Sequence, residues 1–316
     1  MSEPIIINGR KLGRFRAGWL LFKESWRFLS ADRAMIWIPA IAVMASVFLF
    51  GVLVSVFALV AVATDMVMVP EGEEVEGVLV YAFVFGIYLI SAFTLALSQA
   101  GIAKIVYARV HGEKLALKQG IKTALAHWPS LLVWSLITST VGLFLNIIAE
   151  RSKMLGKLVS MFLGAGWALL TYFVVPAIVI DKLPATKAIS RSGTVFKNTW
   201  GETLVSNFSI GIIFALAHVM AFLAIGGLVV MSVVLQIPVL VGPLILLLLV
   251  WVVVASLVQS AMNAVVKTLL YVFATENTSP EDFDSELLEH MLGRNNYLRP
   301  AINIVTDGPQ NTFISG

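Results

Sequence analysis

The sequence predicts an all-α polytopic membrane protein with six transmembrane helices. Of its 316 residues, 59% are hydrophobic and 13% are charged, and the mean hydropathy is +0.90. Soluble domains are about 45–50% apolar and about 25% charged, so the composition excludes a soluble enzyme. Two further observations support the prediction. Long stretches of the sequence lack Asp, Glu, Lys and Arg, and the basic residues are concentrated on one side of these stretches. Cysteine is absent, which excludes disulfides, thiolate metal sites and cysteine nucleophiles.

The uncharged stretches define the spans, because about 20 apolar residues cross a bilayer. They cover residues 34–64, 77–103, 123–149, 158–180 and 203–266. The last stretch is too long for one helix, and it has turn-forming residues near its middle: Gln236, Pro238, Gly242 and Pro243. Dividing it there gives six spans. In the fourth span, Pro176 removes a backbone hydrogen bond near Tyr172 and should kink the helix.

The basic residues predict the orientation. Alternate connections carry 19 Lys and Arg on one side of the spans and 3 on the other, and basic residues accumulate on the cytoplasmic face. We therefore expect both termini in the cytoplasm of a prokaryote and the spans in its plasma membrane. The expected parts are a basic amphipathic segment (1–33), a six-helix membrane domain (34–274) and an acidic tail with one short helix (275–316). The first span is too long for a cleaved signal peptide.

A basic amphipathic run that ends in tryptophan precedes the first, third and fifth spans. The first run carries the stripe Leu12, Phe15, Trp19, Phe22, Trp26 and Leu29. The second carries Leu117, Ile121, Leu125 and Trp128, and the third carries Ile189, Phe196 and Trp200. Each run is followed by a span, a short loop and another span. This order predicts three repeats of an amphipathic helix plus a transmembrane hairpin.

These amphipathic helices are the candidate lipid interface, because a basic helix with aromatic anchors lies in the headgroup plane and attracts anionic lipid. The candidate residues are Trp19, Trp26, Trp128, Trp200, Lys23, Lys122 and Arg191. The expected partners are membrane lipids, anionic on the cytoplasmic face. In the alternative interpretation the helices only fix the depth of each hairpin in the membrane.

Polar residues inside the spans form a candidate intramembrane cluster: Gln99, Asn146, His218, Gln259 and Asn263. They could line a path for a small neutral solute, or they could be hydrogen-bonding contacts between helices. His218 is the best ionisable candidate, and in the second interpretation it bonds to Gln259 or Asn263. The uncharged stretches disfavour a proton- or sodium-coupled carrier, which keeps charged groups at membrane depth.

The sequence lacks the motifs of several known catalytic and nucleotide-binding sites. The sequence has no phosphate-binding glycine-rich loop, no HExxH pattern and no glycine-flanked nucleophilic serine. The acidic loop from Asp65 to Glu76 lacks the spaced ligands of a calcium site. We therefore expect no enzyme activity, no cofactor and no metal, and the formal charge of +3 does not favour nucleic-acid binding. The helix expected after Ser279 docks under the bundle or offers a surface to a protein partner.

Several segments carry a resemblance to a known family. They are "SWRFLSADRAMIWIPAIAV" from Ser25, the long run that starts "TVGLFLNIIAERSKMLGKL" at Thr140, and "LLYVFATENTSPEDFDSELL" from Leu269. With these segments the chain resembles a family of prokaryotic six-pass membrane proteins of unknown function. It is more loosely similar to the membrane domain of some glycerophosphodiester phosphodiesterases, through the proline-containing fourth span and "ATKAISRS". That similarity implies shape and not hydrolysis, because the chain has no catalytic barrel.

The functional expectation that follows is a non-catalytic scaffold, assembly factor or lipid-organising component of the plasma membrane. The alternative is a passive or facilitated carrier for a small neutral or lipidic substrate. The carrier would be favoured if four of the polar residues met at one cleft: Gln99, Asn146, His218 and Gln259.

Overall fold

The computed structural model describes residues 5–7, 10–12, 14–63, 78–151, 155–199 and 209–278. It is an α-helical protein with six helices long and apolar enough to cross a membrane, as predicted. The loop from Asp65 to Glu76, Trp200 and the helix expected after Ser279 lie outside the described residues.

The first repeat contains α1 (Arg14–Ala31), the short η1 (Arg33–Ile36), α2 (Trp37–Ala63) and α3 (Val78–Val110). Strands β1 (Ile5–Ile7) and β2 (Arg10–Leu12) precede it as an antiparallel pair. The prediction that Leu12 begins the helical stripe is therefore wrong. The missed signal is Asn8-Gly9 between the strands, a dipeptide typical of two-residue hairpins.

The second repeat contains α4 (Leu117–Ala126), α5 (Trp128–Arg151), α6 (Leu155–Leu170) and α7 (Val174–Ile180). The fourth span is thus two helices, because the chain leaves the α-helix between α6 and α7. Pro176 has no N–H to give to the carbonyl of Tyr172, so the predicted kink near Tyr172 is confirmed.

The third repeat contains α8 (Ala185–Thr199), α10 (Ser209–Val234), the short η3 (Pro238–Leu240) and α11 (Val241–Glu276). The predicted division of the long apolar stretch is confirmed. Gln236 has a φ of 56° in the connection, and Pro238 begins η3. An amphipathic helix therefore precedes each pair of spanning helices: α1, α4 and α8.

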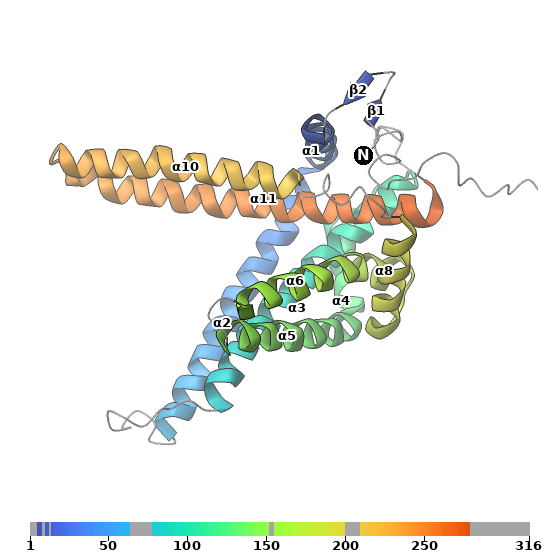
Figure 1. The fold of residues 1–316 in the computed structure, drawn as a ribbon, viewed down its shortest axis with the longest axis horizontal. Coiled ribbons are helices and arrows are strands. Elements are labelled where there is room, and N and C mark those ends of the chain that lie inside the picture. The colour runs from blue at the N-terminus through green and yellow to red at the C-terminus, as the bar shows by residue number, and fades with distance from the viewer. Residues whose placement is uncertain are drawn as a thin grey trace, which may run out of the picture.

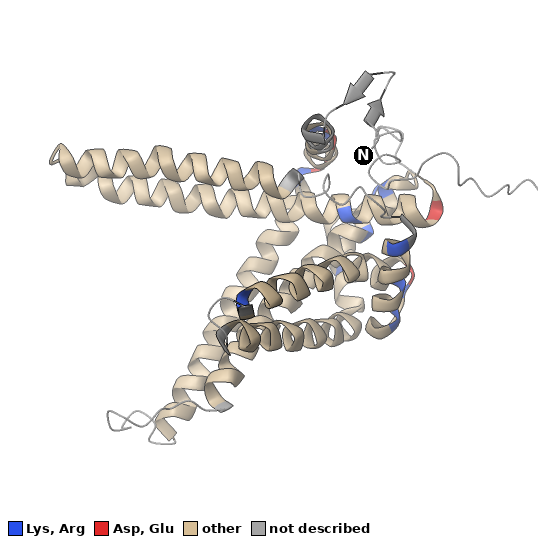
Figure 2. Ribbon diagram, viewed as in Figure 1, with Lys and Arg blue, Asp and Glu red and all other residues tan. Residues whose placement is uncertain are grey.

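The buried core lies at one end of the bundle, in a region that we call the hub. The hub consists of α1, η1, the second half of α3, α4, the start of α5, α7, α8 and the last part of α11, from Ala261. Charged residues gather around the hub, and the hairpins beyond it carry few of them (Figure 2). The hub therefore lies on the basic side of the spans.

The hairpins leave the hub in different directions. The α2–α3 and α5–α6 hairpins pack together through α3 and α5, whereas α10 packs on α11 and on α1. In Figure 1, α10 and the first half of α11 run side by side away from the other hairpins. Most of their large apolar side chains are exposed, which suits a surface that meets lipid.

Candidate functional site

Each amphipathic helix, α1, α4 and α8, packs against the rest of the hub through small side chains. Ser25 of α1, Gly120 and Ala124 of α4, and Ala188 and Ser192 of α8 are all buried. These small residues let each helix approach a membrane helix closely: α4 packs on α3, α8 on α7, and α1 on α10 and α11. The amphipathic helix of one repeat thus covers the last spanning helix of the repeat before it, and α1 covers the last one of the chain.

The closest of these approaches is between α4 and α3. A Cβ atom added to Gly120 would lie 2.8 Å from the carbonyl oxygen of Gly101 and 2.8 Å from Cδ1 of Ile105. Two backbones meet here, so a side chain at position 120 cannot be accommodated by a rotamer change. Only glycine fits at this crossing.

Three of the predicted tryptophans lie on the outside of α1 or at the junction of α4 and α5. Trp19, Trp26 and Trp128 are 50%, 45% and 52% exposed, and Lys23 and Lys122 are exposed beside them. Large aromatic rings and ammonium groups therefore share the outer surface of α1 and of the α4–α5 junction, as an interface with lipid requires. Trp37, which the sequence analysis did not single out, is 65% exposed at the start of α2.

The apolar stripe of α1 does not point in one direction. Leu29 is fully buried and Phe22 packs against Phe214 of α10, with ring centroids 6.0 Å apart. Trp19 stacks on Phe22 at 5.4 Å but remains half exposed. Helical spacing alone cannot separate residues that face the protein from those that face lipid, because both kinds are apolar.

The break between α6 and α7 is closed by a side chain from α8. The hydroxyl of Ser192 donates to the carbonyl oxygen of Leu170 at 2.7 Å and accepts from the N–H of Phe173 at 3.0 Å. Both backbone groups border the break, and Phe173 and Ser192 are fully buried. One hydroxyl thus replaces water at a backbone interruption where water has no access.

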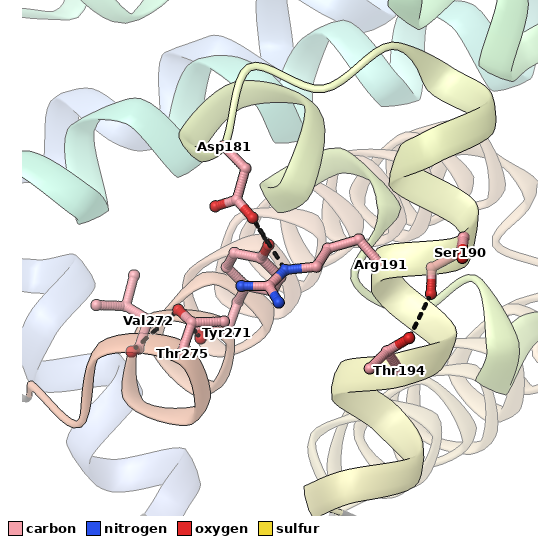
Figure 3. Close-up of polar contacts among 7 residues, drawn as sticks. All are labelled: Asp181, Ser190, Arg191, Thr194, Tyr271, Val272 and Thr275. Carbon is pink, nitrogen blue, oxygen red and sulfur yellow. Dashed lines mark hydrogen bonds and ion pairs between the residues drawn. The ribbon is translucent and has the colours of Figure 1, made fainter.

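Asp181 connects three helices of the hub. Its Oδ2 accepts from Nε of Arg191 at 3.0 Å and from the hydroxyl of Tyr271 at 2.8 Å. Figure 3 shows Arg191 of α8 and Tyr271 of α11 meeting at this carboxylate, which follows α7. Tyr271 and then Asp181 raise the pKa of the Arg191 guanidinium, although burial opposes them. Arg191, a predicted lipid-interface residue, is therefore already engaged by a protein carboxylate.

The ends of α3 and α11 are also joined. His111 lies 2.9 Å from the carboxylate of Glu276, between its Nε2 and Oε2. Arg109 donates to the carbonyl oxygen of Phe28 at 2.8 Å and stacks over its ring at 4.0 Å. The cationic end of α3 therefore fixes α1 on one side and α11 on the other.

Two lysines of the hub face tyrosine rings. Nζ of Lys267 lies 5.0 Å from the ring centroid of Tyr172, and Nζ of Lys104 lies 5.6 Å from that of Tyr107. Both lysines are partly buried. They are the first charged residues that follow the apolar parts of α11 and α3.

The predicted intramembrane residues lie on four helices: Gln99 on α3, Asn146 on α5, His218 on α10, and Gln259 and Asn263 on α11. All five are partly buried. Asn146 lies 18 residues beyond Trp128, about 27 Å along α5, whereas Gln99 lies near the hub. Asn146 and His218 belong to hairpins that diverge (Figure 1).

His218 is bonded within its own helix, with Nδ1 2.6 Å from the carbonyl oxygen of Phe214. Among the described residues, no hydrogen bond joins it to Gln259 or Asn263. Side-chain bonds between spanning helices come instead from Ser46 to Thr94 at 2.7 Å and from Trp167 to Thr138 at 3.2 Å. Hydroxyl groups thus take part in these contacts between spanning helices, in place of the pairing expected of His218 with Gln259 or Asn263.

The described part of the chain contains no group of three His, Cys, Asp or Glu residues that could hold a metal. No curated protein and no solved structure matches the chain. A family model described as "Family of unknown function (DUF6159)" matches residues 78–281, from the start of α3 to beyond the end of α11. The match covers about two thirds of the sequence and all of the hub except α1 and η1. The chain, with its six helices long and apolar enough to cross a membrane, therefore belongs to the DUF6159 family.

Proposed function

We propose that this protein is a non-catalytic, lipid-organising component of a prokaryotic plasma membrane. The observation that carries the proposal is the two-sided construction of the interfacial helices. Small residues such as Gly120 and Ser25 fix the helices to the hub, and tryptophan and lysine remain exposed on the outside. A surface of this kind binds anionic lipid through aromatic burial and through about 1 kcal/mol for each basic residue near the headgroups.

The proposal places the hub and both termini in the cytoplasm, as the 19 to 3 division of basic residues indicates. The natural chain has no cysteine, so single cysteines introduced at Glu73 and Thr278 report the orientation cleanly. An impermeant thiol reagent added outside intact cells should label position 73 only. Labelling of both positions from one side would contradict the orientation.

The lipid function can be tested with the whole protein in polymer-bounded membrane discs. Discs extracted from vesicles of phosphatidylglycerol and phosphatidylcholine should be richer in the anionic lipid than the vesicles from which they came. The double variant Lys23→Gln, Lys122→Gln should lose most of this enrichment. Lys157→Gln, which removes an exposed charge from α6 away from the hub, is the matched control and should keep it. Equal lipid composition in all three discs would overturn the proposal.

A second candidate function is a carrier for a lipidic substrate. It is supported by the interrupted fourth span and by the divergence of the α10–α11 hairpin, since broken helices form binding sites in transporters. The test is transfer of a fluorescent phospholipid between the leaflets of proteoliposomes. Transfer faster than in empty vesicles would favour the carrier over the lipid-organising function.

A further inference from the structure

Lys267 ends the long uncharged stretch of α11. It follows 26 uncharged residues of α11, from Val241 to Val266. Those residues extend about 39 Å, enough to cross a hydrocarbon core of about 30 Å. The ammonium group therefore lies at the hub end of the apolar stretch, where a spanning helix of this length reaches the lipid headgroups.

In the part of the chain that the structure describes, no carboxylate is paired with Lys267. Its helical neighbours Val266 and Thr268 are buried, and its Nζ faces the ring of Tyr172 at 5.0 Å. No carboxylate of the described residues forms an ion pair with it, whereas Arg191 and Arg27 each have one. A partly buried ammonium without an anion is unfavourable, so this position favours an anion from outside the chain.

Lys104 is a second lysine of the hub without an ion pair among the described residues. The contact between His111 and Glu276 aligns the ends of α3 and α11, which pack against each other. Lys104 precedes His111 by seven residues and Lys267 precedes Glu276 by nine, so each lysine lies two to three helical turns from this contact. Lys104 also faces a tyrosine and forms no ion pair among the described residues.

We propose that Lys267 binds the phosphate group of one anionic phospholipid at the hub, beside the α6–α7 break, with Lys104 of α3, which packs against α11, adding positive charge. Asn263 lies one helical turn further into the membrane on the same side of α11 and offers an amide donor below the phosphate. This inference rests on the lipid-organising function proposed above and deepens it, because it adds one discrete site to a general lipid-binding surface. The shared chemistry of lipid and free anion is the phosphate group.

The identity of the ligand can be tested with the wild-type protein alone. Native mass spectrometry of the purified chain with equal phosphatidylglycerol and phosphatidylcholine should show one phosphatidylglycerol retained in preference. Added inorganic phosphate should not displace it, because it lacks the acyl chains. Displacement by inorganic phosphate would support the phosphate site and identify the free anion as its ligand. Equal retention of the two lipids would overturn the proposal.

Variants then test whether Lys267 makes the contact with the lipid. Lys267→Gln should lower retention of the single phosphatidylglycerol about tenfold, as expected for loss of a charge-assisted contact, and Lys267→Arg should restore it. Lys187→Gln, an exposed lysine of α8, is the matched control and should retain the lipid. Wild-type retention in Lys267→Gln, or an equal loss in Lys187→Gln, would contradict the site.

The double variant of Lys23 and Lys122 separates this inference from the function on which it rests. It should lower the general enrichment of anionic lipid in membrane discs and leave the single retained lipid in place. If the discs show no enrichment at all while Lys267→Gln still loses its lipid, the general function fails and the discrete site stands. If enrichment persists and the retained lipid is insensitive to Lys267, only the site fails.

Discussion

Apolar side chains have different surroundings in two regions of the molecule: the hub, and the hairpin formed by α10 and the first half of α11. In the hub, protein covers them: Leu29, Met35 and Tyr271 are fully buried. In the hairpin, side chains such as Phe222 and Val239 are 53% and 76% exposed. Lipid can cover an apolar side chain as well as another helix can. Tight packing and polar contacts are therefore needed only where the chain leaves the hydrocarbon, and they are concentrated in the hub.

The comparison predicts opposite effects of adding a methyl-bearing side chain in the two regions. Gly120→Val should destabilise the protein by about 3 kcal/mol, because its Cβ would meet the backbone of Gly101 at 2.8 Å. Gly226→Ala in α10, where nothing lies within 4 Å of the added atom, should be neutral or slightly stabilising, since alanine favours helix. Thermal unfolding in detergent measures both. Equal sensitivity would remove the distinction between hub and hairpin.

The next effect concerns the interrupted span. Ser192→Ala should cost about 2 kcal/mol, because it leaves the carbonyl of Leu170 and the N–H of Phe173 without their partner. Ser190→Ala on the exposed side of α8 removes a hydroxyl without this role and should change the melting temperature little. A tolerated Ser192→Ala would mean that another group satisfies the break.

A smaller effect is expected at the three-helix contact of Asp181. Tyr271→Phe keeps the buried ring and removes the hydroxyl, which donates to the carboxylate at 2.8 Å and also interacts with Arg191, so it should cost about 1 kcal/mol. Tyr81→Phe, on a residue of α3 that is 46% exposed, serves as the control. The two melting temperatures should differ, and identical values would show that the ring alone holds α11 in place.

The smallest effect is expected at His218. Its Nδ1 contacts the carbonyl of its own helix, so His218→Gln should change stability by less than about 0.5 kcal/mol, within the range of substitutions that break no buried network. The variant should also leave lipid retention and any lipid transfer unchanged. Loss of either activity at a normal melting temperature would give the imidazole a chemical role.

Much of the fold could be predicted from the sequence, because the properties that determine it are local. Uncharged length located the six spans, Pro176 located the break, and Gln236 with Pro238 located the last turn. The exposed positions of Trp19, Trp26 and Trp128 also follow from the repeated pattern, although Leu29 of the same stripe turned out to be buried.

The contacts of the hub could not be predicted, because they join residues far apart in the sequence. Asp181 and Tyr271 are 90 residues apart, and Ser192 reaches a break 19 to 22 residues before it. Small residues such as Gly120 and Ala188 have no amphipathic signature, yet they form the packing face of their helices. The amphipathic pattern therefore identifies the exposed aromatic side chains of these helices but not the small residues of their packing face.

The length of α11 has a mechanical consequence. Its 36 residues form one helix without an internal break, so the half in the hub and the half in the hairpin move as a single rod. A tilt of about 10° at the hub would displace the far end, about 39 Å away, by roughly 7 Å. A small rotation of α11 at the contacts of Lys267, Tyr271 and Glu276 thus produces a larger displacement of its far end, where lipid surrounds α10 and α11.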